Sequence, residues 1–215
     1  MGRVLRAQTG QLYELSDGEQ VWLGRIENVS RDRIQFDLVE QLPVVHPDVN
    51  VTLLLAVVKF DAFEWAIEKA TELGVSTIVP LAAERSEKAL LAAAAKRADR
   101  WKKILLEASQ QSRRVRVSML AALAKPDSAF ASRKDAFGVL LSERSTASPL
   151  RKVLQGQRAA SAILAIGPEG GWTEKEFSAA CKSGFNEASL GRRILRTETA
   201  VVTALASLSF ALGDE

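Results

Sequence analysis

The chain has 215 residues, of which 47% are hydrophobic and 26% charged, with a formal net charge of +3. These proportions are typical of a globular protein that buries a sizeable core, and the charge is too small to imply a polyanionic partner by itself. One cysteine excludes an internal disulfide. With a single histidine there is no His/Cys cluster at metal-ligand spacing, so we expect no metal.

The two ends of the chain give no membrane signal. Residues 1–6 have no apolar core that could serve as a signal peptide. The most apolar run, residues 200–212, is shorter than the roughly 20 residues that span a bilayer. We therefore expect a cytoplasmic protein without a membrane partner.

The first forty residues are predicted to form short antiparallel strands. Residues 12–15 lead into the turn Ser16-Asp17-Gly18, and the stretches 20–26 and 33–39 alternate apolar and polar residues. The prolines between 42 and 47 discourage helix and central strand, so they indicate a boundary. This places a small β domain at residues 1–45.

From residue 49 onward the pattern switches to strands alternating with helices. Strands are predicted at 51–58, 75–82, 136–141, 160–166 and 187–190, and helices at 62–73, 90–112, 173–183 and 198–212. Gly74 is expected to cap the first helix, and Thr173 with Glu176 to form a capping box on the third. The alternation predicts an α/β domain over 49–215 with a mainly parallel sheet.

Two glycine-bearing turns follow apolar strands in the last third of the chain. The first, Gly167-Pro-Glu-Gly-Gly, has neither a P-loop lysine nor a dinucleotide fingerprint. Glu169 in this turn, with Glu174 and Glu176 in the helical turn that follows, would repel phosphate and tolerate a cationic, sulfonium-bearing cofactor. The alternative is a tight turn that only feeds a capped helix.

The second turn runs from Leu190 to Thr197 and carries Arg192, Arg193 and Arg196. Three neighbouring arginines cannot all belong to a core. Ile194 and Leu195 must be buried against either a ligand such as adenine or the core. Arg196 is the arginine we expect in a site, since it precedes the Thr-Glu start of a buried helix.

Positive charge is concentrated between residues 85 and 116, where ten Lys/Arg stand against three acidic residues. Such segregation is the usual footprint of a nucleic-acid backbone partner, although a solvated helix face explains most runs of this kind. Cys181 is expected to be a small buried residue, and His46 to lie in the linker.

Several of these segments together resemble the RsmE-type ribosomal RNA methyltransferases of the SPOUT superfamily. The resemblance is carried by residues 2–6, 59–61, 68–75, 80–86 and 107–114, and most specifically by 166–171 together with 190–200. It implies transfer of a methyl group from S-adenosyl-L-methionine to N3 of a uridine in 16S rRNA of the small ribosomal subunit. The implied fold is a PUA-like β-barrel followed by an α/β domain with a C-terminal trefoil knot, active as a homodimer.

The resemblance also assigns residues to the site. The catalytic group comprises Arg114, Arg196 and Glu198, with the arginines facing the uridine and Glu198 as a candidate proton acceptor that could equally cap its helix or pair with Arg196. The cofactor group comprises Leu141, Ser142, Ile166, Gly167, Glu169, Gly170, Gly171, Leu190, Gly191, Arg193, Ile194, Leu195 and Thr199. The RNA-binding candidates rest on the concentration of basic charge and not on the resemblance, and they are Arg3, Arg6, Arg85, Arg113, Arg114 and Arg116.

The chain departs from the family pattern in three places. It starts where members carry some further residues, so we expect the barrel to be incomplete. Arg113 and Ser118 replace a more usual glycine and proline, and Phe60 interrupts a basic turn at 59–62. Two other functions stay open at this point: a non-catalytic RNA-binding protein, and a SPOUT enzyme acting on another rRNA or tRNA position.

Overall fold

The computed structural model describes residues 7–44 and 47–213. The chain divides into two compact units. The first comprises the chain up to residue 46 together with residues 113–117, and the second comprises residues 47–112 and the chain from residue 118 onward.

The first unit is a three-stranded antiparallel sheet of order β1-β2-β3, formed by β1 (Leu12–Ser16), β2 (Val21–Val29) and β3 (Ile34–Leu42). The predicted hairpin turn is confirmed between β1 and β2. Asp17 Oδ1 accepts the backbone N–H groups of Glu19 and Gln20, both at 2.8 Å. These donors lower the pKa of the Asp17 carboxyl, because they favour its charged form.

Residues 113–117 pack against this hairpin. Ser16 Oγ donates to the Val115 carbonyl at 2.7 Å, and Arg116 Nε donates to the Gly18 carbonyl at 2.6 Å. Arg113 has a φ of +54°, a left-handed conformation that favours glycine.

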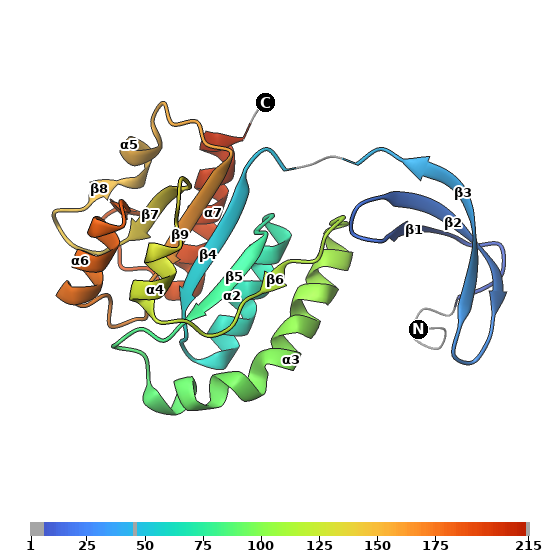
Figure 1. Cartoon of the computed structure of the whole chain (residues 1–215), viewed down its shortest axis with the longest axis horizontal. Coiled ribbons are helices and arrows are strands. Elements are labelled where there is room, and N and C mark those ends of the chain that lie inside the picture. The colour runs from blue at the N-terminus through green and yellow to red at the C-terminus, as the bar shows by residue number, and fades with distance from the viewer. Residues whose placement is uncertain (1–6, 45–46, 214–215) are drawn as a thin grey trace. The chain divides into compact units, whose positions relative to one another are not determined.

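The second unit is built on a seven-stranded sheet of order β6-β5-β4-β9-β7-β10-β8, in which every pair of neighbours is parallel (Figure 1). Its strands are β4 (Asn50–Ala56), β5 (Thr77–Leu81), β6 (Met119–Leu120), β7 (Phe137–Leu141), β8 (Ser148–Pro149), β9 (Ser161–Ile166) and β10 (Asn186–Ser189). Its helices are α2 (Phe60–Glu72), α3 (Lys88–Gln111), α4 (Pro126–Ala131), α5 (Leu150–Leu154), α6 (Glu174–Lys182) and α7 (Thr197–Leu212).

Both faces of this sheet are buried, as the continuous apolar run of β4 predicts. Leu53 and Leu55 belong to one core cluster with residues of α2, α3, α5 and α7, whereas Leu54 and Ala56 belong to a second cluster with residues of α4 and α6. Alternate side chains of a strand point to opposite faces, so each face receives its own helical layer. The predicted α/β fold with a small antiparallel β unit is confirmed.

A few local predictions were incomplete or wrong. The short elements α4, α5, β6 and β8 were not predicted, because they have few residues and little periodicity of their own. Cys181 is exposed, not buried, since it lies in the last turn of α6 away from the apolar face. Among the described residues no helix is long and apolar enough to cross a membrane, and no cluster of potential metal ligands is found.

Candidate active site

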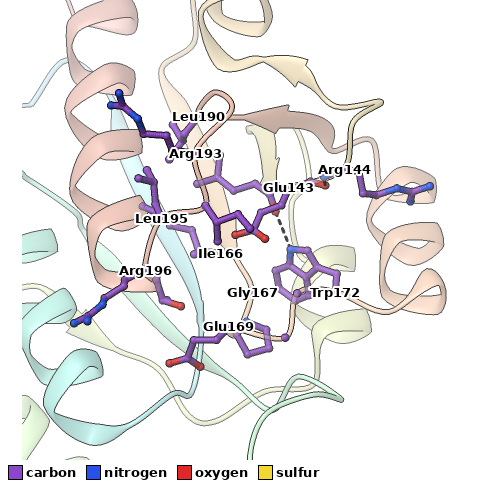
Figure 2. A pocket seen from close by; sticks show the side chains of 18 of the residues that line it. Glu143, Arg144, Ile166, Gly167, Glu169, Trp172, Leu190, Arg193, Leu195 and Arg196 are labelled. Carbon is purple, nitrogen blue, oxygen red and sulfur yellow. Dashed lines mark hydrogen bonds between the residues drawn. The ribbon is translucent and has the colours of Figure 1, made fainter.

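The loops that follow three neighbouring strands of the sheet surround a cavity of about 540 Å³ at the carboxyl ends of those strands (Figure 2). The strands are β9, β7 and β10. Because they are parallel, the loops that follow Leu141, Ile166 and Ser189 meet at their carboxyl ends, the edge where open α/β sheets bind ligands.

Most of the predicted cofactor residues line this cavity, although they come from three separate segments. The lining residues among them are Leu141, Ser142, Ile166, Gly167, Glu169, Gly170, Gly171, Leu190, Gly191, Arg193, Ile194 and Leu195. Thr199 is the predicted cofactor residue that the cavity lining does not include. It lies in the first turn of α7.

The glycine turn after β9 is shaped by a tryptophan. The Trp172 indole N–H donates to the Leu141 carbonyl at 3.0 Å, so it joins the turn to the end of β7. The ring is only 5% exposed and packs edge-to-face on Phe130. A Cβ atom at Gly167 would lie 3.0 Å from Trp172 Cε2, so this glycine is needed for the close approach of the ring.

The turn then closes on itself and starts α6. The Gly171 N–H donates to the Pro168 carbonyl at 2.8 Å, and Gly171 has a φ of +70°. The predicted capping box is confirmed: Glu176 Oε2 accepts the Thr173 N–H at 2.8 Å, and Thr173 Oγ1 accepts the Glu176 N–H at 3.3 Å. The other oxygen of the buried Glu176 carboxylate accepts the Glu84 N–H at 2.9 Å, which ties residues 84–86 to the start of α6.

The second turn leaves its charged and apolar residues at the surface. Gly191 has a φ of +117°, Arg192 and Arg193 are exposed, and Ile194 is 81% exposed. The core therefore does not bury Ile194. Leu195 is half-buried in the cavity wall, and Thr197 is buried where α7 begins.

The loop after β7 is held in place by Arg144. Its guanidinium carbon lies 4.6 Å from the centroid of the Phe177 ring. Its Nη1 is 3.4 Å from Glu174 Oε2 and its Nε is 3.9 Å from Glu187 Oε1. Figure 2 shows that this side chain points away from Ile166 and Leu195, so it stabilises the cavity wall from the α6 side.

Sequence reasoning missed several residues of the cavity wall. They are Glu143, Arg144, Pro168, Trp172, Phe177, Arg192, Thr197 and Ala200. Glu143 and Arg144 directly follow the predicted Leu141-Ser142 segment, and Trp172 ends the glycine motif, so extending each segment would have found them. Nothing local in the sequence points to Phe177, which reaches the cavity from α6.

The predicted catalytic residues occupy different places. Arg196 lines the cavity, and its side chain extends on the side of Glu169 in Figure 2. Glu198 is in the first turn of α7, and it is not one of the described residues that line the cavity. Arg114 belongs to the first unit, where its Nε donates to the Arg116 carbonyl at 3.3 Å and burial lowers the pKa of its guanidinium.

The predicted RNA-binding arginines are also divided. Arg85 lines the cavity. Arg113 and Arg116 lie in the first unit, within 3.7 Å of Glu14 and Glu19 respectively. Arg3 and Arg6, like His46, lie outside the described residues.

The chain resembles known proteins over nearly all of its length. Residues 46–209 match the RNA methyltransferase domain family. A ribosomal RNA small subunit methyltransferase E from Synechocystis sp. is 35% identical over 221 residues, which span 96% of this chain and 68% of that protein.

Solved structures show the same resemblance. A ribosomal RNA small subunit methyltransferase E from Neisseria gonorrhoeae, bound to S-adenosyl methionine, has a TM-score of 0.89 at 30% identity. The match covers 99% of this chain and 88% of that chain. The Aquifex aeolicus TrmH/SpoU tRNA modifying enzyme has a TM-score of 0.50 at 12% identity, and the match covers 77% of this chain and 76% of that chain. This similarity concerns the fold alone. From the family match and the extent of these identities, the chain belongs to the RNA methyltransferase family of the ribosomal RNA small subunit methyltransferases E.

Proposed function

We propose that the protein methylates N3 of a uridine in 16S rRNA of the small ribosomal subunit, with S-adenosyl-L-methionine as the methyl donor. The observation that carries the proposal is the cavity in which the glycine turn and the arginine turn meet. The Neisseria gonorrhoeae relative, crystallised with S-adenosyl methionine, supports the same donor.

The residues of the cavity fit this cofactor. A volume of about 540 Å³ is in the range of roughly 300–1,000 Å³ usual for small-molecule sites. Leu141, Ile166, Leu190 and Leu195 offer apolar walls for an adenosine, and the loop backbone offers hydrogen-bonding groups. Glu143 and Glu169 supply negative charge for a ligand that carries a sulfonium and an ammonium group. When bound, the cofactor supplies a methyl carbon that is activated by the positively charged sulfur to which it is bonded.

Arg196 is proposed to stabilise the acceptor base. N3 of uridine carries a weakly acidic proton, and it attacks well only when that proton leaves and negative charge grows on the ring. A fixed guanidinium lowers the energy of that charge and orients the ring through its planar donors. Arg114 is proposed for the same role, which requires residues 113–117 to reach the cavity of their own or of a second subunit. Glu198 is proposed to accept the proton, directly or through water.

A homodimer is proposed from the exposed face of α7. Thr199, Thr203, Ala206 and Phe210 are exposed at helical spacing, and Phe210 is 93% exposed. We propose that a second copy covers this face together with Ile194. Phe210→Glu should then yield monomers in analytical ultracentrifugation, and an unchanged sedimentation coefficient would remove this face from the interface.

The RNA is proposed to contact Arg85 at the cavity and, outside the cavity, Arg3, Arg6, Arg113, Arg114 and Arg116. Small ribosomal subunits are the proposed partner, and the cytoplasm, where they are assembled, the proposed location.

The test is a methylation assay on small subunits that lack the modification, followed by mass spectrometry of the nucleosides. The expected product is N3-methyluridine, with calorimetry showing about one S-adenosyl-L-methionine per chain. Arg196→Ala should abolish methylation while the thermal unfolding midpoint and cofactor binding stay near wild type. A folded protein without cofactor affinity would favour a plain RNA-binding function, and a methyl group at another position would favour a different acceptor.

A further inference from the structure

Arg85 is held over the glycine pair of the first turn. Its Nη1 donates to the Gly170 carbonyl at 2.6 Å. A Cβ atom at Gly170 would lie 3.4 Å from both Cβ and Cδ of Arg85, so the aliphatic part of the arginine packs directly over this glycine. The pair Gly170-Gly171 thus gives an arginine from a distant part of the chain access to the edge of the cavity.

The backbone around Arg85 is fixed from several sides. The Glu84 N–H donates to the buried Glu176 carboxylate at 2.9 Å, and Thr173 Oγ1 donates to Glu84 Oε2 at 3.1 Å. The Ser86 N–H donates to the Ala83 carbonyl at 3.1 Å, and Ser86 is buried. An arginine whose own backbone is anchored in this way is pre-organised, which is what a site that stabilises developing charge requires.

Two other cavity arginines, Arg144 and Arg193, are less suited than Arg85 and Arg196 to reach a base beside the glycine turn. The Arg144 guanidinium lies on Phe177 and near two carboxylates. In Figure 2 the Arg193 side chain extends away from Glu169, whereas Arg196 extends on the same side as Glu169. Arg85, bonded to the residue after Glu169, is therefore at the same end of the cavity as Arg196.

We propose that Arg85 is a second catalytic arginine, which donates a hydrogen bond to one of the two carbonyl oxygens that flank N3 of the acceptor uracil. This rests on the proposed function. Loss of the N3 proton spreads negative charge onto both oxygens, so two cations stabilise the anion better than one. A guanidinium has five N–H donors. Since the contact with Gly170 uses one of them in the described part of the chain, donors remain for the base. Arg85 makes and breaks no covalent bond.

The test compares Arg85→Gln and Arg85→Lys with Arg151→Gln, which removes the same charge from an exposed position of α5. Single-turnover methylation is measured on small subunits that lack the modification, and cofactor affinity by calorimetry. We expect Arg85→Gln to slow methylation about 100- to 1,000-fold, as loss of one charge-stabilising donor does. Arg85→Lys should retain part of the rate, and Arg151→Gln should match wild type. The dissociation constant of S-adenosyl-L-methionine should change less than about twofold, because Arg85 is assigned to the base and not to the cofactor.

A second substrate separates charge stabilisation from a structural effect. Fluorine at C5 makes N3 of uridine more acidic, so subunits carrying 5-fluorouridine at the target should restore much of the Arg85→Gln rate while changing wild type little. Wild-type rates in Arg85→Gln overturn the proposal. So does a loss of rate that follows a loss of cofactor affinity, or one that 5-fluorouridine does not relieve, because the arginine then only supports the Gly170 turn. If wild type itself fails to methylate the subunits, the proposed function fails, and the control reveals this before any variant is compared.

Discussion

Replacing Gly167 by alanine tests whether Trp172 sets the shape of the cofactor cavity. The added Cβ would lie 3.0 Å from Trp172 Cε2 and 3.2 Å from Cδ2 and Nε1. The ring has little room to retreat, because it packs on Phe130, with the ring centroids 5.7 Å apart, and its N–H is bonded to the Leu141 carbonyl. The turn must therefore move, and with it one wall of the cavity.

The magnitude follows from this geometry. One extra methyl group in a close-packed site costs about 1–3 kcal/mol. If the cost falls on the arrangement that binds the cofactor, the dissociation constant of S-adenosyl-L-methionine rises roughly 5- to 150-fold. If it falls on the folded state, the unfolding midpoint drops by roughly 2–4 °C per kcal/mol for a chain of this size.

Calorimetry and thermal unfolding on Gly167→Ala, Trp172→Phe and the double variant separate these effects. Phenylalanine is smaller and lacks the N–H, so Gly167→Ala should cost less in the Trp172→Phe background, with a coupling energy of about 0.5–3 kcal/mol. Wild-type affinity and stability in Gly167→Ala, or costs that simply add in the double variant, would refute the assignment of Trp172 as the residue that shapes this turn.

Three smaller changes test other contacts. Arg144→Ala should lower stability by about 1–2 kcal/mol in urea unfolding, since it loses a cation–π contact and partly exposed ion pairs, and an unchanged midpoint would show that these contacts contribute nothing. Glu176→Ala should cost about 1–3 kcal/mol in the same assay because the Glu84 and Thr173 N–H groups lose their acceptor, whereas Glu176→Gln, which keeps one oxygen, should cost less. Because the pKa of Asp17 is lowered in the folded state, its contribution to folding stability is present above the ordinary pKa of an aspartate and is lost as the pH falls through the lower folded value. An NMR titration should show the Glu19 and Gln20 amide signals shifting together in acid, and Asp17→Asn should abolish that shift.

The sequence could predict those parts of the fold that depend on local chemistry. The capping box at Thr173 and Glu176 needs only two residues three positions apart, and the end of α2 needs only Gly74, which has a φ of +90°. The apolar run of β4 predicts burial on both faces. The short helices α4 and α5 could not be predicted, because they have too few residues to show a periodic pattern and packing against the rest of the fold stabilises them. The trefoil knot is a property of the whole chain path, so it stays an implication of the resemblance.

The site was predictable at its glycines and not at the residues that pack on them. Gly167 and Gly170 were recognised as a turn that could bind a ligand. Their actual neighbours are Trp172, which bonds 31 residues back in the chain, and Arg85, which bonds 85 residues forward. A glycine in a sequence indicates that something approaches the backbone closely, but only the three-dimensional arrangement identifies what approaches.

Carboxylates on the surface offset part of the positive charge that the sequence concentrates between residues 85 and 116. Much of the basic run from residue 85 to 116 is paired: Arg97 and Arg100 with the buried Glu64, Lys102 with Asp99, Lys103 with Glu107, and Arg113 and Arg116 with Glu14 and Glu19. Of the five arginines in the cavity wall, Arg144 is paired with Glu174 and Glu187, whereas Arg85, Arg192, Arg193 and Arg196 have no carboxylate within ion-pair distance among the residues the structure describes. A phosphate backbone exchanges counterions most favourably with cations that are not already neutralised. The unpaired arginines of the cavity wall are therefore the cations nearest to the proposed chemistry that an RNA phosphate could contact without first displacing a carboxylate.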